Sequence, residues 1–166
     1  TTGDKIEKIL LKLKKKNLVD VVSNPEFLRE GEAISDFLRP DRVIIGTNSK
    51  KANAKMKSLY MPIIKKNSRY FNTSRRGAEL IKYASNAFLA TKISFINELA
   101  NLCEKTGVDI KDISQGMGSD QRIGERFLRA GPAYGGSCFP KDTRALIDTA
   151  NQFKTDLTIV KSVISS

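Results

Sequence analysis

The sequence predicts a mainly α-helical fold that is built around one long helix and carries a small α/β part. Apolar residues keep a helical period from just after Gly77 as far as Gly107, well beyond the usual length of a helix in a small domain. Two short apolar runs, at 18–22 and 43–46, have the length and composition of buried strands. A chain of 166 residues with 40% hydrophobic residues suffices for one domain or for parts of two.

The first part of the chain predicts helices and strands in alternation. Residues 4–16 have the spacing of an amphipathic helix. Ser23 and Asn24 are capping residues, and Pro25 suits the first position of a helical turn. The stretch 49–66 has helical periodicity, which Pro62 is expected to kink or end.

Beyond the long helix, Asp109 is expected to cap a shorter helix through Ile113, and a glycine-rich irregular stretch then covers 116–136. A last helix is expected to start near Pro140. The long helix would approach ~45 Å, too long to bury its apolar sides within one small domain. We therefore expect it to form the interface of a homodimer.

The amino-acid composition limits the classes of partner that the protein is expected to bind. The net charge is +11, and a basic surface attracts polyanions, but the lysine-rich segments lack the interleaved aromatic residues of a single-strand binding groove. We interpret them as solvated surface and expect no nucleic acid as partner. A basic helical module that binds nucleic acid or serves in assembly is the alternative from another class. No apolar run reaches the ~20 residues of a membrane span, and no signal peptide is evident, which predicts a cytoplasmic protein.

Histidine is absent, which excludes Ser-His-Asp and Cys-His catalysis and any histidine metal site within the chain. Two cysteines alone make a poor zinc site, so no metal is expected. The chemistry must then use cysteine, carboxylates, lysine and amides.

The sharpest local signal is the segment GPAYGGSCFPKD at 131–142. Gly135 and Gly136 allow positive φ, and Pro140 suits a first helical turn, so Cys138 is expected beside a helix N-terminus whose partial positive charge favours the thiolate. Asp142 follows by about one turn and is expected to be an exposed, well screened carboxylate. Cys103 lies in the apolar register of the long helix and is expected to be buried.

Two further pairs have a four-residue spacing, Glu26 with Glu30 and Lys82 with Asn86, and each pair would lie on one side of a helix. Taken singly, such pairs are ordinary surface chemistry. Asn86 has below-average propensity for a helix interior, a mild indication that it is there for another reason.

Three motifs occur in a fixed order: NPEFLREG at 24–31, AELIKYASNAFLATKISFINELANLCEKTGVDI at 78–110 and SDQRIGERFLRAGPAYGGSCFPKD at 119–142. Together they resemble the UDP-glucose 6-dehydrogenase family over roughly residues 17–150. The resemblance implies NAD-dependent four-electron oxidation of a UDP-sugar, UDP-glucose to UDP-glucuronate. It also implies that 1–70 is the C-terminal part of an NAD-binding Rossmann domain and that 71–166 is the central helical dimerisation domain.

The resemblance also implies roles. Cys138 would form a thiohemiacetal and then a thioester with the substrate. Lys82 and Asn86 would stabilise the oxyanion, Glu26 would act in acid–base and hydrolysis steps, and Asp142 would support the cysteine and bound water. Substrate would also be bound by Phe27, Leu28, Arg29, Glu30, Phe127, Leu128, Arg129, Ala130, Gly131 and Gly135, and by Arg122 reaching a neighbouring subunit. Glu30 and Lys141 would face NAD.

The chain departs from the family pattern because it has no G-x-G-x-x-G cluster, so the chain alone is expected to be inactive. The closest alternatives are UDP-N-acetylmannosamine and GDP-mannose dehydrogenases, which share the mechanism. The segment RIGERFLRAG, at 122–131, favours the UDP-glucose branch.

Overall fold

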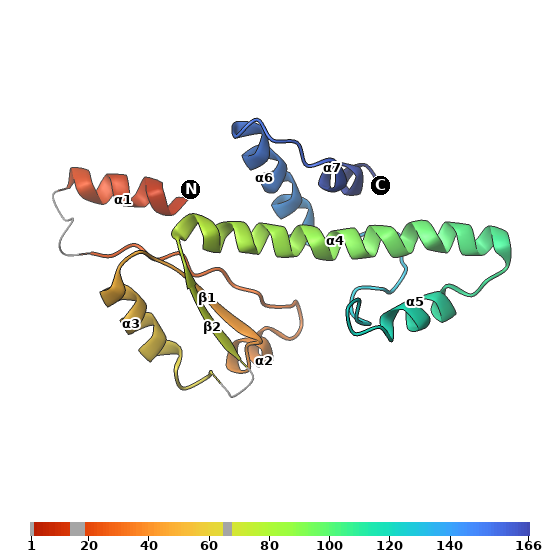
Figure 1. The fold of residues 1–166 in the computed structure, drawn as a ribbon, viewed down its shortest axis with the longest axis horizontal. Coiled ribbons are helices and arrows are strands. Elements are labelled where there is room, and N and C mark those ends of the chain that lie inside the picture. Colours follow the sequence, from red (N-terminus) through yellow and green to blue (C-terminus); the bar gives the residue numbers. More distant parts are fainter. Residues whose placement is uncertain (1, 14–18, 65–67) are drawn as a thin grey trace. The chain divides into compact units, whose positions relative to one another are not determined.

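The computed structural model describes residues 2–13, 19–64 and 68–166. Contacts within the chain divide it into two compact units, Thr1–Lys82 and Tyr83–Ser166, and the division falls inside the longest helix. The elements along the chain are α1 (Thr2–Lys12), α2 (Ala33–Leu38), β1 (Arg42–Gly46), α3 (Lys50–Tyr60), β2 (Arg69–Thr73), α4 (Arg75–Thr106), α5 (Ile110–Gly118), α6 (Phe139–Gln152) and α7 (Thr158–Ser165) (Figure 1). The fold is mainly α-helical, as predicted.

The first unit contains two parallel strands, β1 and β2, in a register that pairs Arg42 with Arg69 and Gly46 with Thr73 (Figure 1). The apolar side chains of β1 form its core, and α3 packs against this strand. β1 is one of the two strands that the sequence predicts. The other is wrong: residues 19–22 form no strand, Leu18 lies outside the described residues, and the partner of β1 is β2.

Solvent exposure and the lack of a paired strand explain why residues 19–22 form no strand. Val19 is exposed, and the segment reaches the sheet only through an isolated antiparallel bridge between Ser23 and Gly46. An apolar run becomes a strand only where it finds a ladder partner, because its backbone groups need hydrogen bonds. β2 is only partly buried, and its sequence RYFNT carries no strong apolar run that would have identified it.

The helical turn expected at 24–30 is also absent, and the segment is irregular up to the turn at Glu30. Asn24 does not cap a helix, since its amide donates to the Ile44 carbonyl at 3.1 Å and its side-chain oxygen accepts from the Tyr60 hydroxyl. These bonds attach the segment to β1 and α3 in an extended form. α3 itself is capped by Ser49 and ends two residues before Pro62, as predicted.

The helix α4 has 32 residues and is therefore ~48 Å long at ~1.5 Å per residue. It ends before Gly107, whose φ of +73° is the left-handed conformation that glycine adopts at helix ends. Asp109 then caps α5 by accepting from the Lys111 amide at 2.8 Å. The predicted end at Ile113 is wrong, since α5 continues through Gly118.

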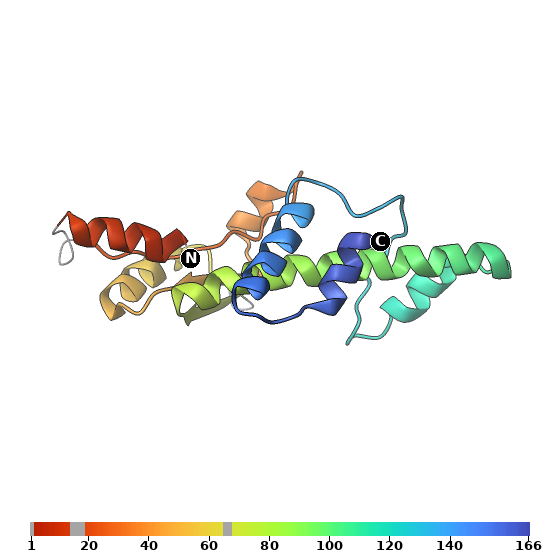
Figure 2. The same ribbon diagram turned by 90° about the horizontal axis from the view of Figure 1, so that it is seen from above.

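Gly118 is required where it lies because a Cβ there would come within 2.9 Å of the Glu125 Cα, as the chain returns past α5. The second unit closes with α6 and α7, which pack as a helical pair (Figure 2). α6 begins next to Pro140, as predicted, whereas α7 was not predicted. None of the helices in the described part of the chain combines the length and hydropathy that a bilayer span needs.

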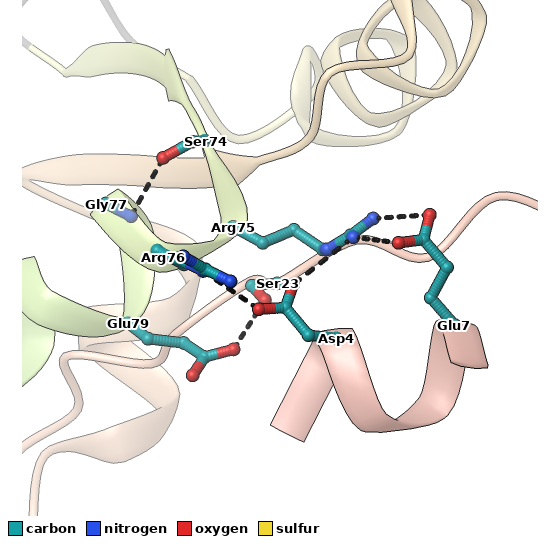
Figure 3. Close-up of polar contacts among 8 residues, drawn as sticks. All are labelled: Asp4, Glu7, Ser23, Ser74, Arg75, Arg76, Gly77 and Glu79. Carbon is teal, nitrogen blue, oxygen red and sulfur yellow. Dashed lines mark hydrogen bonds and ion pairs between the residues drawn. The ribbon is translucent and has the colours of Figure 1, made fainter. Parts of the chain in front are cut away.

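In the first unit, a cluster of charged side chains connects α1 to the beginning of α4 (Figure 3). The Arg75 guanidinium bonds to Glu7 and, at 3.3 Å, to Asp4, while Arg76 Nε donates to Asp4 at 2.9 Å. The hydrogen bond from Arg76 is the main reason that the pKa of Asp4 falls from 3.8 to about 2. A carboxylate that prefers its charged form in the folded state stabilises that state.

We therefore expect Asp4→Asn to lower the melting temperature at pH 7. Because the folded-state pKa is depressed, this contribution is present above pH ~4 and is lost as the pH falls towards about 2. Circular dichroism melts at pH 7 and at pH 2.5 to ~3 would show a gap between variant and wild type that shrinks with acid. Asp148→Asn, at an exposed position on α6, is the matched control. An equal gap at both pH values would contradict the assignment.

Candidate active site

Glu26 and Lys82 form an ion pair within the first unit. The Lys82 ammonium lies 3.0 Å from Glu26 Oε1, and Glu26 Oε2 accepts from the Leu28 amide at 2.8 Å. The lysine side chain is only 15% exposed, although the carboxylate is open to solvent. The irregular segment after Asn24 thus brings a predicted acid–base group onto a predicted oxyanion-binding group that is 56 residues away in sequence.

The ring of Phe27 contacts two cations. The Arg42 guanidinium lies 4.2 Å from the ring centroid, and the Lys82 ammonium lies 5.4 Å from it. Both distances are within the range of a cation–π attraction. Phe27 is therefore held between β1 and α4, and its ring borders the Lys82 ammonium. Arg42 was not singled out from the sequence, because a basic residue at the start of a strand carries no signal.

Arg29 is placed by a different contact. Arg29 binds Asp36 of α2 through two side-chain bonds of 3.0 and 2.6 Å, and its backbone amide donates to the same carboxylate at 2.9 Å. Glu30 is exposed at a turn before Gly31, whose φ is +82°. The helical spacing predicted for Glu26 and Glu30 is wrong, since this segment is not a helix. Asp36 was not predicted as a partner of Arg29, because the two residues are seven positions apart across a turn and no periodic pattern relates them.

In the second unit, Asn86 and Asp142 form a buried pair. Asn86 Nδ2 donates to Asp142 Oδ2 at 2.6 Å, and both residues are buried. The expectation of an exposed, screened Asp142 is wrong, because the residue is only 3% exposed and packs against α4. The other oxygen, Asp142 Oδ1, lies 3.5 Å from the exposed ammonium of Lys141. Asn86 is thus a buried polar residue of α4 whose side chain has a hydrogen-bond partner on α6.

Cys138 occupies the N-cap position of α6, as predicted, with Pro140 in the first turn. Its carbonyl accepts from the Asp142 amide at 2.9 Å, so the cysteine and the buried carboxylate share the first turn. The sulfur is half-buried and lies 3.7 Å from the Ser137 hydroxyl. Of the two preceding glycines, Gly136 has a φ of +80°, whereas Gly135 is not among the residues with positive φ. Cys103 is buried, as predicted.

The loop at 119–131 carries the other predicted ligand residues. Phe127 has a φ of +66° and meets Phe139 edge to face, with ring centroids 6.2 Å apart. Leu128 is 3% exposed, so its side chain is packed inside the second unit. Arg129 is exposed and Ala130 half-exposed. Arg122 is also exposed and is paired with Asp120 at 2.6 Å.

Each unit thus holds a compact set of predicted residues. The first brings an exposed carboxylate to a largely buried ammonium. The second places a half-buried thiol one turn from a buried carboxylate and amide. A thiol at a helix N-terminus is suited to attack a carbonyl carbon, and ammonium and amide donors are suited to stabilise the oxyanion that results.

Comparison with known proteins matches both parts of the chain. Residues 1–64 match the NAD binding domain of the UDP-glucose/GDP-mannose dehydrogenase family, and residues 76–166 match the central domain of the same family.

A UDP-glucose 6-dehydrogenase from Rickettsia typhi is 56% identical over 147 residues, which are 89% of this chain and 34% of that protein. Among solved structures, a UDP-glucose dehydrogenase from Pyrobaculum islandicum is 41% identical with a TM-score of 0.85, over 92% of this chain and 35% of the other. A UDP-D-ManNAc dehydrogenase from Pyrococcus horikoshii is 27% identical with a TM-score of 0.84, over 99% of this chain and 38% of the other. The chain spans about a third of the length of the relatives it matches. It belongs to the UDP-glucose/GDP-mannose dehydrogenase family.

Proposed function

We propose that this chain provides the cysteine centre of an NAD-dependent UDP-glucose 6-dehydrogenase that converts UDP-glucose to UDP-glucuronate. The observation that carries the proposal is the position of Cys138 at the N-terminus of α6, one turn from the buried Asp142–Asn86 pair. Higher identity to relatives named for UDP-glucose than to one named for UDP-D-ManNAc favours the glucose substrate. Residues 1–70 would be the end of the NAD-binding domain, and 71–166 the central domain.

In the proposed reaction, the sugar's primary alcohol is oxidised to the aldehyde, and the Cys138 thiolate adds to the carbonyl carbon. The thiohemiacetal carbon then gives up a hydride and becomes a thioester. Water attacks this thioester, the C–S bond breaks, and the acid leaves with the thiolate restored. NAD, when bound, accepts the two hydrides, one in each oxidation.

Other side chains within each unit have roles that follow from their own contacts. Lys82 supplies a largely buried cation for the developing oxyanion, and its partner Glu26 is exposed and able to accept or return a proton. Asp142 holds the amide of Asn86 so that the remaining amide hydrogen can donate to the substrate oxygen.

Among the described residues, the side chains of Lys141 and Glu30 are suited to contact NAD, but no glycine-rich turn that would hold its pyrophosphate is present. A dinucleotide pyrophosphate is usually held by backbone amides at a glycine-rich turn, and residues 1–166 contain no G-x-G-x-x-G. The exposed ammonium of Lys141 suits a phosphate, and Glu30 would lie near the cofactor from the first unit. The UDP-sugar would be bound by the segments 27–30 and 127–131, by Gly135 and by Arg122. The cytoplasm, where both nucleotides occur, is the proposed location.

The complete gene product that contains this chain should release two NADH for each UDP-glucose consumed, measured by absorbance and by chromatography of the nucleotide sugars. The 166-residue chain alone should release none, because it lacks the glycine fingerprint. Faster turnover of UDP-N-acetylmannosamine or GDP-mannose than of UDP-glucose would show that the proposed substrate is wrong and that the faster nucleotide sugar is the substrate. Tight, salt-dependent binding of nucleic acid with no turnover of any nucleotide sugar would refute the function.

Cys138→Ser in the complete gene product should lower steady-state formation of the acid by at least ~100-fold, because an oxygen ester is hydrolysed more slowly than a thioester. Intact-protein mass spectrometry should then detect a substrate-derived adduct. Cys103→Ala, at the buried cysteine of α4, is the matched control and should keep its turnover. Wild-type rates in the serine variant would exclude Cys138 as the nucleophile.

We also propose that the chain forms a homodimer through α4. Phe88, Phe95 and Leu102 are 66%, 47% and 56% exposed. Their seven-residue spacing places them along one line of the helix within the second unit, with a drift of only ~20° per step. A second copy carries the same line, so the two stripes can cover each other in an isologous contact.

Phe95→Glu should convert the dimer to a monomer at ~20 µM, because it places a charge in the middle of the apolar stripe. Sedimentation velocity measures the change. Asn101→Glu adds the same charge at an exposed position of α4 away from the stripe and should stay dimeric. A monomeric wild-type chain, with its helical content intact, would contradict the proposed interface.

A further inference from the structure

The loop at 119–131 is attached to α4 at two points by side chains that the proposed reaction does not use. The Lys92 ammonium donates to the carbonyls of Ile123 at 3.0 Å and Gly124 at 3.2 Å. Five residues further along α4, Asn97 Oδ1 accepts from the Gly131 amide at 2.9 Å. One contact fixes the beginning of the loop, and the other fixes its end.

The second contact lies at the end of the segment 127–131. Inside this segment, Leu128 is buried and Phe127 packs against Phe139 of α6. Gly131 has no side chain to pack, and a Cβ added there would meet nothing within 4 Å. Packing therefore does not fix this end of the segment, whereas the hydrogen bond to Asn97 does.

We propose that Asn97 is a positioning residue for the nucleotide sugar. It would act through the Gly131 amide, holding the backbone of 127–131 in the conformation that receives the substrate, and would not touch the substrate itself. The inference rests on the proposed function, because it takes that segment as part of the UDP-sugar site. Lys92 supports the same loop from its other end. A segment fixed in advance loses less conformational entropy when the ligand binds.

A purely structural role would produce a different result. If Asn97 only stabilised the fold, its loss would lower the melting temperature and affect both substrates alike. A positioning role predicts a selective effect on the nucleotide sugar. Asn97→Leu removes the acceptor at a similar volume, whereas Asn97→Asp keeps a side-chain oxygen for the Gly131 amide. Asn101→Leu, one turn further along α4 at an exposed position, is the matched control.

The experiment compares these three variants in the complete gene product. We expect Asn97→Leu to raise the KM for UDP-glucose about 3- to 10-fold, the size expected for one hydrogen bond. The KM for NAD should stay within about 2-fold. Amide exchange followed by mass spectrometry should show faster exchange in peptides that contain Gly131. Asn97→Asp should restore both values towards wild type, and Asn101→Leu should change neither.

The outcomes separate this inference from the function on which it rests. Wild-type protein that neither binds nor oxidises UDP-glucose would remove the proposed function and this inference with it. Normal wild-type activity, with an unchanged KM for UDP-glucose in Asn97→Leu, would overturn the positioning role alone. Unchanged exchange at Gly131, or equal increases in both KM values, would also overturn it.

Discussion

The second unit depends on one buried polar contact, the hydrogen bond from Asn86 of α4 to Asp142 of α6. A carboxylate removed from water is strongly destabilising unless its oxygens are bonded. Here one oxygen accepts from the amide and the other faces Lys141, while the N-terminus of α6 adds favourable partial charge. Because this bond joins α6 to α4, it also holds Cys138, which shares the first turn of α6 with Asp142.

Helix α4 serves the second unit as a common support for segments that are distant in sequence. Asn86 holds α6, Lys92 and Asn97 hold the loop, and Ser94 meets the Ser166 hydroxyl at 3.0 Å. Asn86 and Ser94 are buried and Lys92 and Asn97 are partly buried, in a helix whose other buried positions are mostly small or aliphatic. The same helix therefore supplies both apolar packing and the polar contacts that define where the irregular segments lie.

The elements with a strong local pattern could be predicted from the sequence. The long helix, β1, α3 with its end before Pro62, and the start of α6 at Pro140 all follow from periodicity, caps and proline. β2 and the extended segment after Ser23 could not, because each depends on a partner from elsewhere in the chain.

Part of the candidate site could likewise be predicted from the sequence, and part of it could not. The position of Cys138 at a helix start follows from its own neighbours, whereas the burial of Asp142 depends on Asn86, 56 residues away. Glu26 and Lys82, which form the ion pair, are also 56 residues apart in sequence. No local pattern around either residue indicates the other. Their proposed roles came from the resemblance to a family. Arg42 and Asp36, which hold Phe27 and Arg29, had no signal of either kind.

The backbone conformation of the loop at 119–131 explains why its attachments to α4 are needed. Phe127 adopts a left-handed conformation, which costs a residue with a Cβ ~1 kcal/mol or more and persists only where the surroundings impose it. The surroundings here are the edge-to-face contact with Phe139, the burial of Leu128 and the two attachments to α4. The aromatic contact joins the loop to the residue that follows Cys138. The conformation of the segment proposed to receive the sugar nucleotide is thus coupled to the start of α6, so the placements proposed for the substrate and for the Cys138 nucleophile would depend on the same packing.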